Sequence, residues 1–236
     1  MSEPTLYPES GFLRLRIDLA YDGTNYSGWA KQPDQRTIQE EIEKALSTAT
    51  QSPIESIVAG RTDAGVHASG QVIHVDVPQA TEVDGLAFKL NCMLDEDIRI
   101  LTVRVMTTEF HARFTATARS YNYTILDGNR VLPPLHRLDV APWYRTLDID
   151  LLNSASALLL GSHDFAAFCK FREGATTVRN LVRFHWIRNE EGYLIADIAA
   201  DAFCYSMVRN LVGAVVCVAE GRNNLDWIAA MLANKE

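Results

Sequence analysis

One short segment concentrates the residues most able to do chemistry. It reads GRTDAGVH (residues 60–67) and joins two apolar stretches. Arg61 and Asp63 are two positions apart, so in an extended chain their side chains would project to the same side, where the guanidinium would keep the carboxylate ionised. An ionised, positioned carboxylate can act as a nucleophile or a base. By themselves these residue types favour an Asx turn with a surface ion pair, so the pattern makes Asp63 only a candidate.

Two further side chains are candidates for a binding site in the second half of the chain. Tyr121 lies in an alternating segment in which Arg119, Tyr121 and Tyr123 share one face of a predicted strand. Arg209 lies in a predicted helix, off its apolar stripe and above Gly213, where a small residue leaves room for backbone or ligand. The alternatives are an aromatic residue at the edge of the core and a solvent-facing helical arginine.

Hydrophobic periodicity predicts the elements that position the GRTDAGVH segment. Residues 13–19 alternate as a half-buried strand does, and apolar residues then recur at helical spacing after Thr37 and Glu40, a capping-box pattern. The elements predicted for the first half are a strand at 13–19, a helix at 38–49, an apolar run at 54–59, a strand at 72–77, a helix at 85–94 and a strand at 98–106. The candidate segment is therefore a loop before a strand.

The second half repeats a similar order of elements. They are a strand at 119–126, a helix at 149–160, strands at 178–189 and 193–201, a helix at 206–220 and a last helix from 225. The hydrophobic pattern lapses between these halves, which predicts a boundary near residue 112 and two domains, 1–112 and 113–236. The fold class is α+β and mainly antiparallel, with a hint of internal structural duplication.

Composition excludes several classes of protein. The 236 residues are 47% hydrophobic and 22% charged, values of a globular chain rather than a disordered or fibrous one. The longest apolar stretch, near 211–219, is far shorter than the roughly 20 residues that cross a bilayer, and the start has no signal-peptide pattern, which favours the cytoplasm. Histidine spacing predicts no metal site. We expect all four cysteines to be reduced: Cys92, Cys169, Cys204 and Cys217.

Five separated motifs together resemble one known family. The segment GRTDAGVHA is preceded by YDGTNYSGWA and TIQE, and FHARFTATARSYNY (110–123), GSHDFAAF (161–168) and FCYSMVRNLVG (203–213) follow. In this order they are similar to the tRNA pseudouridine synthase A (TruA) family. The resemblance covers nearly the whole chain.

The resemblance implies an activity and a fold. The family isomerises uridine to pseudouridine at positions 38 to 40 of the tRNA anticodon stem-loop, with one aspartate and no cofactor, and the matching aspartate here is Asp63. The implied fold has two similar α+β halves around a mainly antiparallel central sheet with a cleft between them. Family members act as homodimers. The carboxylate could add to an electrophilic carbon or stabilise and deprotonate a cationic sugar, and the sequence leaves both routes open.

The resemblance also implies roles for other residues. A target base must leave its stack, so the enzyme needs a pocket with an aromatic wall, and Tyr121 matches the family's active-site tyrosine. Arg209 matches an arginine thought to pair with the aspartate.

We expect tRNA phosphates to contact a local excess of positive charge that the net charge of −8 conceals. Arg61 belongs to it, and Arg113 and Lys170 are candidate contacts. The cluster also includes Arg14, Arg16, Lys31, Arg119, Arg172, Arg179, Arg183 and Arg188.

Two other classes of function compete with the isomerase. One is an RNA-binding or RNA-chaperone protein that keeps the motif without turnover, and the other is an aspartate-dependent nucleoside hydrolase. Asp63, Tyr121 and Arg209 are all present, which favours an enzyme over a binding protein. The GRTDAGVH segment has no second carboxylate, which weakens the hydrolase hypothesis.

Overall fold

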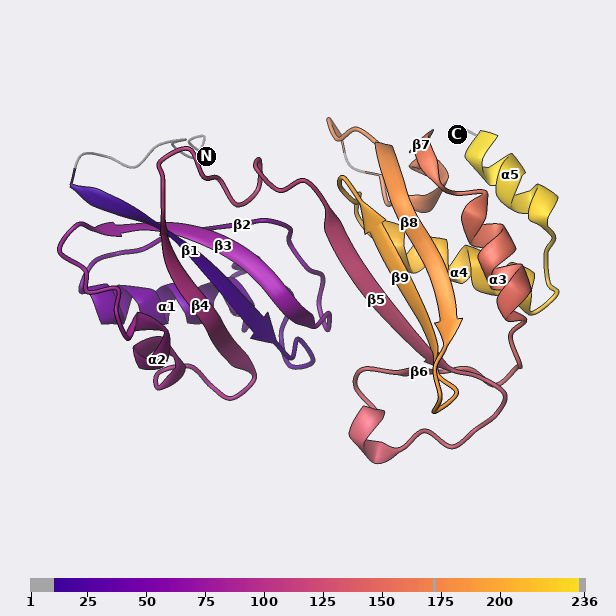
Figure 1. Cartoon of the computed structure of the whole chain (residues 1–236), viewed down its shortest axis with the longest axis horizontal. Helices are drawn as coiled ribbons and strands as arrows, with labels where there is room; N and C mark the ends of the chain where they lie inside the picture. The colour runs from indigo at the N-terminus through magenta and orange to yellow at the C-terminus, as the bar shows by residue number, and fades with distance from the viewer. Residues whose placement is uncertain (1–10, 172, 234–236) are drawn as a thin grey trace. The chain divides into compact units, whose positions relative to one another are not determined.

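Alternating apolar residues make β1 (Phe12–Tyr21) a central strand of the first sheet. The computed structural model describes residues 11–171 and 173–233 (Figure 1). Its contacts divide the chain into two units, residues 1–116 and 117–236, and each has its own hydrophobic core. We refer to them as unit 1 and unit 2. Both combine an antiparallel or mixed sheet with helices, so the predicted α+β class is confirmed.

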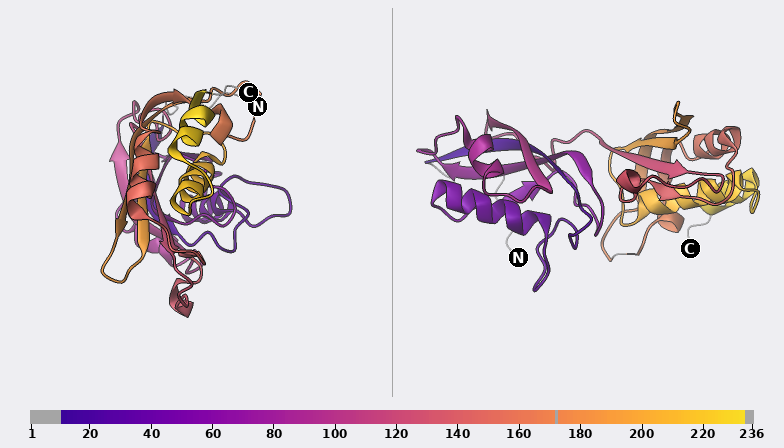
Figure 2. Two further views of the ribbon diagram at one scale, coloured as in Figure 1. Left: turned by 90° about the vertical axis from the view of Figure 1, so that its right-hand side faces the viewer. Right: turned by 90° about the horizontal axis from the view of Figure 1, so that it is seen from below.

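Unit 1 is a four-stranded antiparallel sheet covered by two helices. The strand order is β2 (Ser56–Val58), β3 (Ala68–Pro78), β1 and β4 (Ile98–Met106). The helices are α1 (Ile38–Thr50) and α2 (Leu86–Asn91), and Figure 2 shows α1 lying along one face of the sheet. The core contains Leu15, Ile17 and Leu19 of β1 with Ile38, Ile42 and Leu46 of α1. The other face of β1 carries Arg14, Arg16 and Asp18.

Unit 2 is a five-stranded sheet with three helices. The strand order is β6 (Ala141–Pro142), β5 (Arg119–Leu126), β9 (Leu194–Ala200), β8 (Val178–Arg188) and β7 (Gly161–Asp164). Among the strands of the described residues of this unit, only the β5–β6 pair is parallel. The helices are α3 (Ile149–Ala157), α4 (Met207–Ala219) and α5 (Leu225–Ala233), with short 3-10 turns at Pro134–His136 and Ala166–Phe168.

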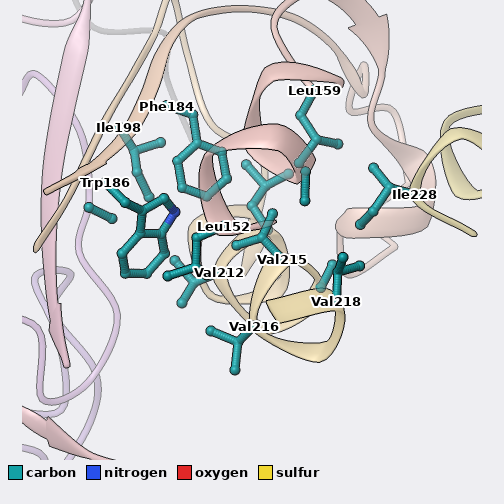
Figure 3. Packing of buried hydrophobic residues seen from close by; sticks show 14 of the residues in the cluster. Leu152, Leu159, Phe184, Trp186, Ile198, Val212, Val215, Val216, Val218 and Ile228 are labelled. Atoms are coloured by element: carbon teal, nitrogen blue, oxygen red, sulfur yellow. The ribbon is translucent and has the colours of Figure 1, made fainter. Parts of the chain in front are cut away.

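Large apolar side chains from the sheet and helices of unit 2 meet in one core. Trp186 and Phe184 of β8 lie against Leu152 of α3 and Val212 of α4, as Figure 3 shows. The Trp186 ring nitrogen is satisfied inside the core by a 3.1 Å hydrogen bond to the Ser156 hydroxyl. This packing fixes α4 on the sheet and so positions the residues at the start of that helix.

Several local predictions are corrected by the structure. The helix after Thr37 begins at Ile38 as predicted, but Thr37 makes no side-chain capping hydrogen bond, and its buried hydroxyl has no partner among the described residues. The helix predicted at 85–94 is shorter, and β6 and β7 were not predicted. Cys169 and Cys204 form a disulfide, contrary to the expectation of four reduced cysteines. None of the described helices has both the length and the apolar character needed to cross a bilayer.

Candidate functional site

Backbone hydrogen bonds fasten the GRTDAGVH segment, here called the signature loop (residues 60–67), to the segment after β1. The Trp29 amide donates to the Thr62 carbonyl at 3.0 Å, and the Gly65 amide donates to the Tyr26 carbonyl at 3.3 Å. The Tyr21 and Thr62 hydroxyls share a 2.8 Å hydrogen bond. The loop is therefore held at several points on one side by residues 21–29.

Two glycines of this supporting segment let the backbones approach closely. A Cβ at Gly23 would lie 2.1 Å from the Val66 carbonyl oxygen. Gly28 has φ +95°, and a Cβ there would lie 3.0 Å from the Thr62 oxygen. A larger residue at either position would push the signature loop away, because an added side chain has no space beside the loop backbone.

His67 joins the end of the signature loop to the same supporting segment. Its Nδ1 lies 2.9 Å from Asp22 Oδ1 and accepts a 3.2 Å hydrogen bond from the Gly23 amide. Hydrogen bonds from Thr24 lower the pKa of Asp22, and the nearby His67 lowers it further. His67 therefore links the end of the signature loop to residues 22 and 23.

Asp63 is half-buried in the signature loop and is not paired with Arg61. The Val66 amide donates to the Asp63 carbonyl at 3.2 Å, so the chain turns here and is not extended. The assumption that put the two side chains on one side therefore fails, and no ion pair joins Arg61 to Asp63 among the described residues. Arg61 is exposed. No described residue of unit 1 donates a hydrogen bond to the Asp63 carboxylate.

Arg14 is a residue whose role the sequence analysis missed. It was expected in the positive cluster, yet its side chain is 0% exposed and forms a bidentate pair with Asp76, at 2.9 and 2.8 Å. It also donates to the carbonyls of Thr108 and Phe110, at 2.9 and 3.0 Å. Arg14 thus fastens the segment after β4 to the sheet.

Two histidines complete this buried contact, and we call residues 108–115 the covering segment. The Ala112 amide donates to His74 Nδ1 at 3.0 Å, and the His74 and His111 ring centroids are 4.6 Å apart. Burial, with the positive charge of Arg14 nearby, lowers the pKa of His74 to about 4. Arg113 and Phe114 follow on the exposed part of the covering segment, with the Arg113 guanidinium 5.6 Å from the ring.

Unit 2 places Tyr121 on the helix-covered side of its sheet. Tyr121 and Tyr123 of β5 lie opposite Ile198 and Ala196, which are buried core residues, so the two tyrosines share a face as predicted. The Tyr121 ring meets Phe203 edge to face, with 5.1 Å between centroids. Half-burial and this contact give Tyr121 a fixed ring orientation.

Arg209 is exposed in the first turn of α4. The helix follows Ser206, which has a left-handed φ of +65° and makes no side-chain capping hydrogen bond. A Cβ at Gly213, one turn further, would meet nothing within 4 Å. The predicted open space above Gly213 is therefore present.

Lys170 lies where two segments of unit 2 are joined. The Cys169–Cys204 disulfide has 5.7 Å between the Cα atoms, and the Lys170 amide donates to the Tyr205 carbonyl at 2.9 Å. The Lys170 ammonium lies 5.4 Å from the centre of the Tyr205 ring. Two nonlocal segments, 169–171 and 203–205, thus form one structure, which we call the tied loops.

Much of the predicted positive cluster is already bound within the protein. Arg16 pairs with Asp18 and Arg183 with Asp197, each at 2.6 Å. The Lys31 ammonium pairs with Glu43. Arg188 binds the buried Asp127 at 2.7 and 3.0 Å. Arg172 lies outside the described residues.

The candidate site residues are divided between the units. Arg61, Asp63 and Arg113 belong to unit 1. Tyr121, Lys170 and Arg209 belong to unit 2. In unit 1 these side chains come from loops, and in unit 2 they come from a strand, a loop and the start of a helix.

Comparisons with known proteins identify the family. A family model described as tRNA pseudouridine synthase matches residues 19–115 and 155–236. The chain is 51% identical to tRNA pseudouridine synthase A of Frankia casuarinae over 223 residues, which cover 94% of this chain and 81% of that protein. The enzymes of the same name from Streptomyces griseus and Mycobacterium leprae are 48% and 43% identical; the matches cover 96% and 93% of this chain and 82% and 81% of those proteins. This chain therefore belongs to the tRNA pseudouridine synthase family.

Proposed function

We propose that this chain isomerises uridine to pseudouridine at positions 38 to 40 of the tRNA anticodon stem-loop, with Asp63 as its catalytic residue and without a cofactor. Membership of the family makes the protein a tRNA pseudouridine synthase, an isomerase that acts on uridine in tRNA. The choice of positions and of Asp63 rests on the resemblance of the GRTDAGVHA motif.

The reaction needs only atoms that the substrate already carries. The bond between N1 of uracil and C1′ of the ribose breaks, the base turns, and a bond forms between C5 and C1′. The proton on C5 leaves and N1 gains one. A carboxylate can serve in two ways, by adding to an electrophilic carbon or by stabilising and then deprotonating a cationic sugar.

The geometry of the signature loop is the structural observation that supports the assignment to Asp63. Residues 21–29 hold the loop through backbone hydrogen bonds and two glycine contacts. The Asp63 carboxylate is half-buried and accepts no hydrogen bond from the described part of unit 1, so its oxygens are available to contact a substrate. A structural aspartate in such a turn normally caps backbone amides, and here the Asp63 backbone carbonyl accepts the turn hydrogen bond instead.

Other residues would bind the RNA. We assign Tyr121 to the wall against which the extruded uracil stacks, because its ring orientation is fixed by Phe203. Exposed Arg61, Arg113, Lys170 and Arg209 would supply donors for phosphates or, for Arg209, a partner for the Asp63 carboxylate.

Release of tritium from tRNA that carries 5-tritiated uridine tests the proposal. Label leaves C5 only if the new carbon bond forms there. We expect release by the unaltered protein and none by Asp63→Asn, which keeps the side-chain volume and removes the charge. Asp84→Asn, at an exposed position of unit 1, is the matched control and should release label normally. Tight tRNA binding without release by the unaltered protein would favour the RNA-binding alternative.

The target position needs a separate experiment. Three tRNA transcripts, each with uridine at only one of positions 38, 39 and 40, should all lose C5 tritium at that position. A transcript with cytidine at all three positions should lose none. Release from this last transcript would place the target elsewhere in tRNA and contradict the positional part of the proposal.

We also propose that the protein acts as a homodimer, as the family resemblance implies. In such an assembly one subunit could position the tRNA for the other subunit's site. Sedimentation analysis at assay concentration should give twice the chain mass of 26.3 kDa. A monomer that is fully active would overturn this part.

A further inference from the structure

The tied loops of unit 2 expose aromatic surface that the core does not use. Phe171 is 88% exposed and Tyr205 is 51% exposed, although both are large and apolar. They come from segments that are distant in sequence, and the Cys169–Cys204 disulfide and the 2.9 Å Lys170–Tyr205 backbone hydrogen bond hold those segments together. The segments that carry the two exposed rings are therefore held together by a covalent bond and a hydrogen bond.

Positive charge accompanies these rings. The Lys170 ammonium lies over the Tyr205 ring at 5.4 Å, and Phe171 is the next residue along the chain. A ring that can stack, next to a cation that can bind a phosphate, is the combination that proteins use to bind single-stranded nucleic acid. A paired helix would not use the rings, because its bases are already stacked on one another.

The tied loops are also connected to the proposed pocket wall. Phe203 begins the second of the two segments and contacts Tyr121 edge to face at 5.1 Å. The same three residues, 203–205, thus support the Tyr121 ring and carry the Tyr205 ring. An RNA strand whose target base lies against Tyr121 would need its neighbouring unpaired bases accommodated as well.

We propose that Phe171 and Tyr205 form a second stacking site, which binds an unpaired base of the tRNA anticodon loop while Lys170 binds an adjacent phosphate. This inference rests on the proposed function, because it assumes that tRNA is the substrate. A second stacking site makes the protein favour RNA in which unpaired bases lie beside the target uridine.

Binding of an isolated anticodon-arm hairpin, measured by fluorescence anisotropy in the Asp63→Asn background, tests the stacking site without turnover. Phe171→Ala should weaken binding at least about fivefold, the lower end of the range for losing one base–aromatic stack. Phe171→Trp should bind within about twofold of the parent, because an aromatic face is kept. Phe88→Ala, at a 75% exposed phenylalanine of α2, is the matched control and should leave affinity unchanged.

Two further readouts separate stacking from a loss of structure or charge. A 2-aminopurine base in the hairpin loop should be quenched on binding, and Phe171→Ala should remove the quenching. Lys170→Gln should lower the slope of log affinity against log salt concentration by about one, whereas Phe171→Ala should leave that slope unchanged. A hairpin whose loop bases are paired to a complementary strand should not distinguish Phe171→Ala from its parent.

The results for the two proposals can be told apart. If Phe171→Ala binds the hairpin like its parent and keeps the quenching, the stacking site is wrong, whatever the tritium assay shows. If the unaltered protein releases no tritium, the proposed function is wrong. The stacking site is then still decided by the hairpin affinity and the 2-aminopurine quenching.

Discussion

In unit 1 the signature loop is held without a covalent cross-link, largely by close backbone contacts, whereas in unit 2 a disulfide joins the tied loops. Two glycines bring the loop that carries Asp63 against residues 21–29. A disulfide and one backbone hydrogen bond join the segments that carry Lys170 and Tyr205. Close backbone contact leaves no room for a side chain at Gly23, whereas Lys170 and Tyr205, beside the disulfide, are exposed.

The two units also contain ion pairs that differ in which partner is buried. Arg14 is 0% exposed and bridges Asp76 to two carbonyls of the covering segment. In unit 2 it is the carboxylate of Asp127 that is buried, while its partner Arg188 is 33% exposed. Asp127 also accepts a hydrogen bond from the Leu147 amide at 2.8 Å. In this pair of unit 1 one buried cation serves several acceptors, whereas in this pair of unit 2 several donors serve one buried anion.

The largest expected effect follows from this difference. Arg14→Met should lower the free energy of unfolding by about 3–5 kcal/mol, because Asp76 and two carbonyls lose a buried partner. Arg188→Met should cost less, about 1–3 kcal/mol, since other donors to Asp127 remain. Urea denaturation gives both values, and amide hydrogen exchange shows in which unit each loss occurs. Equal costs for the two variants would contradict the comparison.

Removing the covalent link should destabilise unit 2. The double variant Cys169→Ser/Cys204→Ser opens a cross-link between residues 35 apart and should cost about 4 kcal/mol in chain entropy. Chemical denaturation without reductant measures this loss. Cys92→Ser, at an exposed free cysteine, should change stability by less than about 0.5 kcal/mol. A double variant as stable as the parent would show that the hydrogen bond alone holds the tied loops.

Because Gly23 lies against the signature loop, we expect a larger residue there to reduce turnover rather than tRNA binding. Gly23→Ala forces the Val66 carbonyl away and should lower the rate of tritium release about 100-fold, the cost of misplacing a reacting group by about 1 Å. Gly70→Ala in β3 is the control, because a Cβ there would meet nothing within 4 Å. Normal release by Gly23→Ala would mean that the signature loop adjusts freely.

The smallest effect is a pH dependence confined to unit 1. His74 faces Arg14, His111 and Asp76, and its pKa falls to about 4 in the folded protein. The folded state disfavours the protonated ring, so the neutral His74 ring makes its full contribution to the free energy of unfolding above the unfolded pKa of 6.5. That contribution is lost as the pH falls toward 4. Between pH 7 and pH 5 the loss should be about 2 kcal/mol.

His74→Gln provides the control for the pH dependence. Glutamine keeps an acceptor for the Ala112 amide but does not titrate, so its stability should vary less over the same pH range. Denaturant midpoints measured at several pH values give the comparison. A parent protein with equally flat stability would show that the covering segment opens and admits water to His74.

Much of the fold could be predicted because its signals are local. The strands at Ile98–Met106 and Arg119–Leu126 have the predicted bounds, since alternation over eight or nine residues is seldom accidental. β6 and β7 were missed because strands of two and four polar or mixed residues carry no period. Thr37 matches the capping-box pattern, yet its side chain makes no capping hydrogen bond. Its hydroxyl is buried and has no hydrogen-bond partner among the described residues.

By itself the sequence determined the α+β class, most helices and strands, and the family, because periodicity and the GRTDAGVHA motif are properties of neighbouring residues. Only the tertiary structure decided that Arg14 is buried and binds Asp76, that Cys169 is joined to Cys204, and that Arg61 is exposed and not paired with Asp63. Thr108 and Phe110 lie 94 and 96 residues from Arg14, and the two cysteines lie 35 apart. Contacts across such separations depend on how the whole chain packs, so no local pattern encodes them.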